Sequence, residues 1–184
     1  MGQQVQFPIQ QTDKFTGFPV FVTSDHAYIH QGIGYELSGT TGSIAAAGTY
    51  IVSLTTAVDT YVHLRPTGLS STANTLQMRI AEESVASGGS VGTPRNKNRN
   101  SKRTSGVTVG LGVTLTTEGT ILEYAQVGSG TSAGNASGGS GDGSANEWVL
   151  KPGKTYSLRF ENVGAVTATV GYYNMFWYEE KAGE

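Results

Sequence analysis

The residues of this chain whose types and spacing could do chemistry are few, and the densest group is basic. Five of the twelve lysines and arginines lie between residues 93 and 103, a stretch without an acidic residue. They are Arg95, Lys97, Arg99, Lys102 and Arg103. Arginine pairs with carboxylates through parallel hydrogen bonds, so this group could bind an acidic protein surface.

The basic residues alternate with asparagine in the sequence RNKNRN. In an extended chain, residues 95, 97 and 99 share one face, and the asparagines at 96, 98 and 100 share the other. We predict that residues 95–103 run extended along the edge or mouth of the fold, with the asparagine amides paired with neighbouring backbone. Arg95 and Arg99 are expected to be ordered against carboxylates or backbone carbonyls, in the protein's own oligomer or on a partner protein, rather than free in solvent. The alternative is a solvated edge whose charges prevent aggregation between sheets.

Neither nucleic acid nor a membrane is an expected partner. The formal net charge is -2, and residues 84 to 121 contain no aromatic side chain that could stack on bases. No segment approaches the ~18 uninterrupted apolar residues that a membrane helix needs, and the N-terminus lacks the pattern of a signal peptide.

The histidines make a weak case for a metal site. His26 and His30 are four residues apart, a spacing that aims two imidazoles at one metal ion only on a helix. The surrounding sequence SDHAYIHQG is expected to be extended or looped. With three histidines and no cysteine in the chain, no metal and no cofactor are expected.

Catalytic motifs are no stronger. The spacing of Gly130, Ser132 and Gly134 matches a nucleophile elbow, but that motif needs a strand before it and a helix after it, and here it lies within a glycine-rich tract. The glutamate pairs at 82–83 and 179–180 are adjacent in sequence, so the two members of each pair point to opposite faces of a strand. We therefore expect that the protein is not an enzyme.

The elements that position these residues read as strands. Short runs of alternating β-branched and aromatic residues, separated by turn residues, are typical of an all-β fold, and 184 residues suit one such domain. We expect strands near residues 35–39, 49–56, 60–66, 75–83, 106–116, 120–127, 146–150, 155–162 and 168–180. The simplest arrangement is an antiparallel β-sandwich, with residues 128–145 as a long flexible surface loop.

Residues 1–30 are expected to form an extended N-terminal arm, and residues 31–184 the sandwich domain. Prolines at 8 and 19 restrict the arm to an edge strand or an extended segment. Its apolar side chains would need a surface to cover them, so they are candidates for binding a partner. They are Phe7, Ile9, Phe15, Phe18 and Phe21.

The last expected strand, GYYNMFWYEE, carries large apolar residues on both faces. Tyr173, Met175 and Trp177 share one of them. We expect a strand buried on one side and covered on the other by a partner subunit or the arm, with these three residues in a homo-oligomer interface. A sugar-stacking platform is the alternative for these aromatic residues.

Several of these segments together resemble a known family. The order of TPRNKNRNS, a TSGVTV strand, a glycine-rich loop, EWVLKPGKTYSLRFENVG and a closing YNMFWYEE strand is similar to that of tailed-phage head decoration proteins, of the capsid cement or head-fibre type. The similarity covers about residues 30 to 180. It implies a jelly-roll-like sandwich without enzymatic activity that assembles as a homotrimer on the outside of a capsid.

The expected function is therefore that of a bacteriophage virion structural protein, made in the host cytoplasm and located on the capsid surface. It would bind the major capsid protein through the arm and the basic residues and stabilise the shell by many repeated contacts. The alternative is a phage tail or fibre protein with a receptor- or glycan-binding role.

Overall fold

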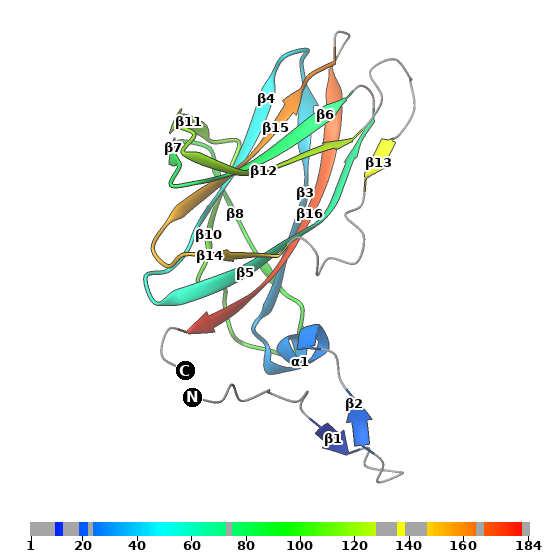
Figure 1. The fold of residues 1–184 in the computed structure, drawn as a ribbon, viewed down its shortest axis with the longest axis vertical. Coiled ribbons are helices and arrows are strands. Elements are labelled where there is room, and N and C mark those ends of the chain that lie inside the picture. Colours follow the sequence, from blue (N-terminus) through cyan, green and yellow to red (C-terminus); the bar gives the residue numbers. More distant parts are fainter. Residues whose placement is uncertain are drawn as a thin grey trace, which may run out of the picture.

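The structure is a computed structural model. It describes residues 10–12, 19–21, 24–72, 75–127, 136–138, 147–164 and 168–181. These residues form antiparallel β-sheets and one short helix, as Figure 1 shows. The elements are β1 (Gln10–Thr12), β2 (Pro19–Phe21), α1 (Ser24–Gln31), β3 (Gly34–Ile44), β4 (Thr49–Thr55), β5 (Thr60–Ser71), β6 (Leu76–Glu82), β7 (Val85–Ser87), β8 (Ser90–Gly92), β9 (Arg95–Asn96), β10 (Thr108–Leu111), β11 (Thr114–Thr117), β12 (Thr120–Val127), β13 (Ala136–Gly138), β14 (Trp148–Leu150), β15 (Thr155–Asn162) and β16 (Thr169–Lys181). The expected all-β class is confirmed.

Two large sheets pack face to face as a sandwich. One has the strand order β13-β5-β16-β3-β9, with β14 also paired to β5, and the other has the order β12-β6-β15-β4-β10-β8. Four antiparallel pairs nest inside one another along the chain: β3 with β16, β4 with β15, β5 with β14, and β6 with β12. Strands far apart in sequence therefore lie side by side in both layers.

Alternating side chains of both sheets fill the space between them. Leu158 and Phe160 of β15, two residues apart, are fully buried there, and so is Leu64 of β5. Burying a large apolar side chain of this kind on folding stabilises the folded state by about 1.5–3 kcal/mol. The core thus follows the two-residue period of the sequence.

The inner face of β16 belongs to this core. Tyr173, Met175 and Trp177 are exposed by only 5%, 1% and 0%. They pack between the sheets of a single chain and leave almost no surface for a second copy. This location corrects the expectation that these three residues form an oligomer interface.

The outer face of β16 is covered by elements of the same chain at Phe176 and Tyr178, whereas Tyr172 on this face is exposed. The Tyr178 ring stacks on Tyr28 of α1 with 4.0 Å between ring centroids. The Lys97 ammonium lies 5.3 Å from the centre of the Phe176 ring. Both rings are buried, and Tyr28 lies within the N-terminal segment that was one of the two expected covers.

Residues 24–31 are helical, which corrects the extended or looped conformation expected for SDHAYIHQG. The helix ends in a Schellman motif, in which Gly32 donates to the Ile29 carbonyl and Ile33 donates to the Tyr28 carbonyl. Gly32 has a φ of 73°, and a Cβ at this position would collide with the side chain of Ser101. The turn therefore requires glycine.

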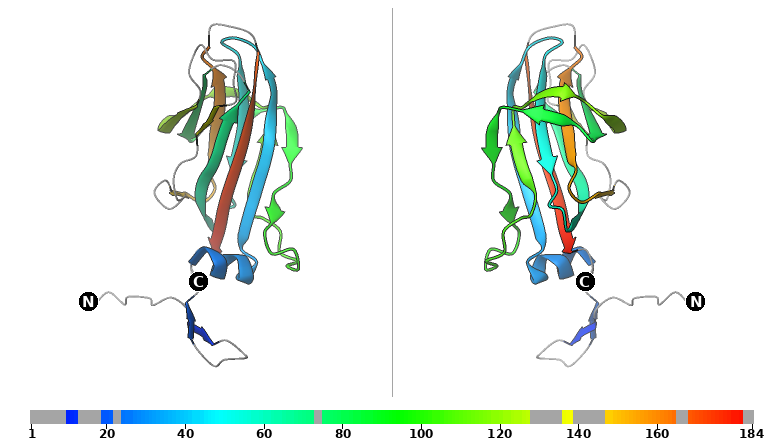
Figure 2. Two further views of the ribbon diagram at one scale, coloured as in Figure 1. Left: turned by 90° about the vertical axis from the view of Figure 1, so that its right-hand side faces the viewer. Right: turned by 90° about the vertical axis from the view of Figure 1, so that its left-hand side faces the viewer.

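The described parts of residues 1–30 are not one extended arm. Helix α1 lies at the lower end of the sandwich in both views of Figure 2 and packs against β3. Strands β1 and β2 pair with each other in a separate two-stranded sheet. The folded body accordingly begins near residue 24 rather than at residue 31.

Two expected elements differ in detail. The stretch 106–116 is not one strand, because β10 and β11 are separated at Gly112, which has a φ of 63°, and belong to different sheets. Within the expected glycine-rich loop, β13 forms a short strand paired with β5. Both differences depend on tertiary pairing that the local pattern does not contain.

Candidate docking surface

The asparagines of the basic stretch attach it to the end of α1. Asn98 Nδ2 donates to the His30 carbonyl at 3.1 Å, and Asn96 Nδ2 donates to the Gly32 carbonyl at 2.8 Å. The last carbonyls of a helix have no partner within it, so the Asn98 amide supplies a missing donor at His30, and the Asn96 amide binds the residue that follows the helix. The predicted pairing of the asparagine amides with backbone is confirmed at these two positions.

The stretch follows the edge of a sheet but is extended only over β9, the edge strand beside β3. The chain then turns, because the Asn96 and Asn98 side-chain oxygens accept bonds from backbone amides two residues ahead, at 2.9 and 3.1 Å. These are Asx turns, a local alternative to extended pairing. The expectation of an extended course over residues 95–103 is therefore wrong beyond β9.

The basic side chains of this loop differ in their surroundings. Lys97 forms an ion pair with Glu36 at 3.2 Å. Arg95 and Arg99 are exposed, and within the described residues neither guanidinium has an ion pair or a hydrogen bond. The two arginines border an open hollow of about 420 Å³ with Glu36, Asn96 and Lys97. We call Arg95, Lys97 and Arg99 the basic row.

Lys102 and Arg103 lie on the returning part of the loop and are exposed. The Arg103 carbonyl accepts a hydrogen bond from Asn96 Nδ2 at 3.2 Å, and the next carbonyl accepts one from the Tyr35 hydroxyl at 3.1 Å. Burial, followed by the charge of Glu179, raises the pKa of Tyr35, so its hydroxyl remains a donor. The structure therefore brings together the basic row and places the other two cations beside it.

Of the apolar residues expected to anchor the N-terminal segment, Phe7, Ile9, Phe15 and Phe18 lie outside the described residues. Phe21 belongs to β2, and only its backbone is described. Their role in binding a partner remains a prediction.

A second polar cluster, which sequence reasoning missed, is centred on Glu147. His63 Nδ1 lies 2.8 Å from one carboxylate oxygen of Glu147, and the Tyr178 hydroxyl donates to the same oxygen at 2.9 Å. Arg65 binds the other oxygen through Nε and Nη2. The rings of Tyr28, Tyr178 and His63 form a continuous stack next to it, with centroid separations of 4.0 and 4.3 Å.

These contacts fix the charge state of the cluster. Burial alone would raise the pKa of Glu147, but hydrogen bonds from His63, Arg65 and Tyr178 outweigh burial and hold the pKa below its usual value. Burial, followed by the hydrogen bond to Glu147, raises the pKa of Tyr178. The carboxylate thus stays ionised and fully engaged, which suits a structural clamp better than a general base.

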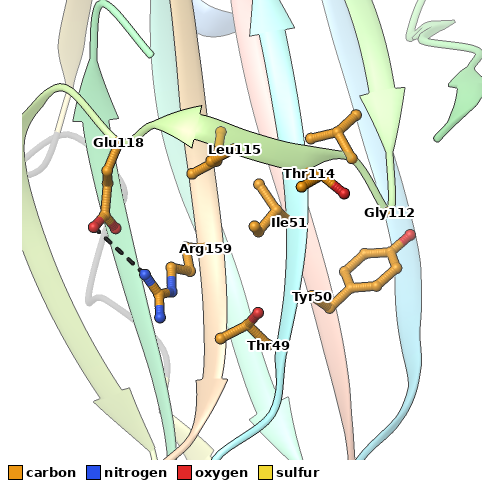
Figure 3. A pocket seen from close by; sticks show the side chains of 9 residues that line it. Thr49, Tyr50, Ile51, Gly112, Thr114, Leu115, Glu118 and Arg159 are labelled. Carbon is orange, nitrogen blue, oxygen red and sulfur yellow. Dashed lines mark hydrogen bonds and ion pairs between the residues drawn. The ribbon is translucent and has the colours of Figure 1, made fainter. Parts of the chain in front are cut away.

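The opposite sheet has a hollow of about 590 Å³, lined by Thr49, Tyr50, Ile51, Gly112, Val113, Thr114, Leu115, Glu118 and Arg159. Figure 3 shows the Arg159 side chain directed toward Glu118, with a separation of 3.5 Å. Arg159 is also 3.3 Å from Glu161, which pairs with Arg79. Charges here neutralise one another within the chain, in contrast to Arg95 and Arg99.

No protein-family model, no curated protein and no solved structure matches this chain. The geometry of its own residues therefore carries the functional argument.

The other candidates for chemistry are engaged elsewhere or lie outside the described part. Glu82 forms an ion pair with Lys151 at 2.5 Å and Glu83 forms one with Lys154 at 2.7 Å. Each of these two glutamates therefore binds its own lysine, and the two carboxylates do not share one site. The elbow-like spacing at 130–134 lies outside the described residues. Among the described residues, no three histidine, cysteine or acidic side chains converge as a metal site, and no helix is long and apolar enough to span a bilayer.

Proposed function

We propose that this chain is a non-enzymatic structural protein of a tailed-phage virion, a decoration protein that binds the major capsid protein on the outer surface of the shell and stabilises it. The sequence segments that resemble head decoration proteins support this proposal. The observation that carries it is the basic row, because the loop that bears Arg95 and Arg99 is attached to the fold while their guanidinium groups face outward.

We also propose that the sandwich is of the jelly-roll type, the arrangement found in many viral capsid domains. In a jelly roll of eight strands, the first pairs with the eighth, the second with the seventh, and so inward. The strands β3, β4, β5, β6, β12, β14, β15 and β16 support this assignment, because their pairs nest in that order. β12-β6-β15-β4 and β14-β5-β16-β3 would be its two sheets.

Docking through the basic row fits the energetics of a repeated contact. The ordering of the loop is already provided by its asparagines, so binding loses less conformational entropy than it would with a free loop. Two outward guanidiniums can each take a carboxylate bidentately. In the proposal, three copies assemble as a homotrimer, and their interface lies outside the core positions of β16.

The test is co-sedimentation of the purified protein with capsid shells of the phage that encodes it. Replacing Arg95 and Arg99 together by alanine should weaken attachment by about 2–4 kcal/mol, or roughly 30- to 1000-fold. The control is the double change Lys154→Ala and Lys181→Ala, which removes the same charge from exposed ion pairs with Glu83 and Asp59. Equal attachment of wild type and the arginine variant would contradict docking through this row.

Cryo-electron microscopy of the virion distinguishes the proposal from the alternative. Density for the protein over the head lattice is expected, in groups of three copies. Density confined to the tail would favour the tail or fibre protein with a receptor- or glycan-binding role.

A further inference from the structure

The two histidines of α1 are brought together on its surface. His26 Nε2 and His30 Nε2 lie 2.8 Å apart, and the two ring centroids are 4.5 Å apart with an angle of 48° between the rings. Both residues are exposed. The rings are therefore tilted rather than stacked, with the two nitrogens that can bind a metal facing each other.

This arrangement follows from the helix. Residues four apart lie one turn above each other on the same face, whereas Tyr28 lies two residues from each histidine, about 200° around the axis. Tyr28 stacks on Tyr178 of the sandwich, so the histidine pair is on the side that faces solvent.

The helix is also held in place at its C-terminal end. The Schellman bonds at Ile29 and Gly32 close its last turn, and Asn98 donates to the carbonyl of His30 itself. The backbone of one of the two histidines is thus fixed by a loop far away in sequence. A site on such an element loses little conformational entropy when a ligand orders it.

We propose that His26 and His30 chelate a divalent transition-metal ion of the zinc class. With metal–nitrogen bonds of about 2.0–2.1 Å and a tetrahedral angle, two ligating nitrogens lie about 3.4 Å apart. The pair must open by only about 0.6 Å from its present separation, a change that small side-chain rotations supply. Imidazole is a ligand suited to Zn²⁺, Cu²⁺ and Ni²⁺.

The proposed ion replaces the contact between the two rings. Each imidazole gives its Nε2 lone pair to the metal and carries its proton on Nδ1. In the ring that now donates through Nε2, the proton leaves Nε2 and Nδ1 takes one up from solvent, so the two neutral rings keep their two protons. No group of three or more histidine, cysteine or acidic side chains surrounds the site among the described residues. Water fills the remaining coordination positions, and the ion exchanges readily.

Isothermal titration of the untagged full-length chain with ZnCl₂ tests the proposal. We expect one Zn²⁺ per chain, a melting temperature that rises with ZnCl₂ concentration, and reversal of both effects by EDTA. The double change His26→Ala and His30→Ala should abolish saturable binding, and each single change should lower the affinity at least about tenfold. Gln31→Ala, an exposed position on the same helix, is the matched control and should bind as wild type does.

Electron paramagnetic resonance of the wild-type protein with one equivalent of Cu²⁺ gives an independent result. Two nitrogen ligands in the spectrum, lost in the double variant, are expected. Absence of saturable Zn²⁺ binding by the wild type, unchanged binding by the double variant, or a Cu²⁺ spectrum without two nitrogen ligands would each overturn the proposal. The wild-type spectrum decides the question even if the double variant does not fold. His63, the third histidine of the chain, is unchanged in every variant, so it cannot account for a loss of binding.

Discussion

At the scale of single residues, Glu147 links two strands and an aromatic stack through one carboxylate. Its two oxygens are shared by His63, Arg65 and Tyr178. Arg65 is 9% exposed, so loss of the Glu147 carboxylate would remove the negative charge that this nearly buried cation binds. Such a loss costs more than the pair itself contributes.

Replacement of Glu147 by glutamine should therefore lower the free energy of unfolding at pH 7 by about 2–3 kcal/mol. The pKa of Glu147 is lower in the folded state than in the unfolded state. Its contribution is therefore present above the unfolded pKa of about 4.3 and is lost as pH falls through the folded pKa. Urea denaturation from pH 7 to pH 3 should show a weaker acid dependence for Glu147→Gln than for wild type.

Glu180 provides the control for this prediction. It lies 3.6 Å from His63 but its side chain is 48% exposed, so Glu180→Gln should change the free energy of unfolding by less than about 0.5 kcal/mol. A Glu147→Gln protein as stable as the Glu180→Gln protein at pH 7 would show that the cluster does not hold this face.

Single residues differ in how far the sequence predicts them. The alternation of basic residues and asparagine predicted that asparagine amides bind backbone, which Asn96 and Asn98 do. The predicted ordering of Arg95 and Arg99 against carboxylates or carbonyls is not seen within the described chain, where both are exposed.

The role of Glu147 could not be predicted in this way. Arg65 and His63 on β5 are 82 and 84 residues from Glu147 in the sequence, and Tyr178 on β16 is 31 residues from it. Only the nested strand order brings these residues together.

At the scale of elements, α1 and the loop that carries the basic row stabilise each other. The Asn98 amide supplies a donor to a helix carbonyl that has no partner within the helix. Asn98→Ala should lower the free energy of unfolding by about 1 kcal/mol and speed hydrogen exchange of the α1 amides. Asn100→Ala is the control, because the Asn100 side chain is exposed. Equal exchange rates for α1 in both variants would argue against the cap.

The sequence contains signals for α1 that the strand-rich context obscured. A serine and an aspartate at 24 and 25 are favoured residue types for the first positions of a helix, and Gly32 is the favoured residue after its end. The helix is only eight residues long, and isolated helices of this length are marginal in water. Its conformation depends on the stack of Tyr28 on Tyr178 and on the hydrogen bond from Asn98 to the His30 carbonyl, which are both tertiary contacts.

At the scale of the whole molecule, strand positions were more predictable than their roles. Alternation of apolar and polar residues located most of the strands, since a half-buried strand has a two-residue period. It did not show that Tyr28 and Lys97 of the same chain cover Tyr178 and Phe176 on the outer face of β16. Apolar residues on both faces of a strand indicate that both faces are packed against other elements. The sequence cannot distinguish a partner subunit from a helix of the same chain as the element that packs there.

Two truncations test where the folded body begins. Removal of residues 1–23 should change the free energy of unfolding by less than about 0.5 kcal/mol, because β1 and β2 pair with each other. Removal of residues 1–31 should lower it by about 3–5 kcal/mol, because the stack on Tyr178 and the acceptor of the Asn98 amide are lost. Urea denaturation measures both.

Single substitutions in the full-length chain separate the contribution of the stack from any general effect of truncation. Tyr28→Ala should reproduce about 2–3 kcal/mol of the loss, since it removes the ring that covers Tyr178. Tyr61 is 43% exposed, so Tyr61→Ala should change stability by less than about 0.5 kcal/mol. If the 1–31 truncation were as stable as the 1–23 truncation, α1 would not be part of the folded body, and the rigid support required by the histidine pair and by the basic row would be absent.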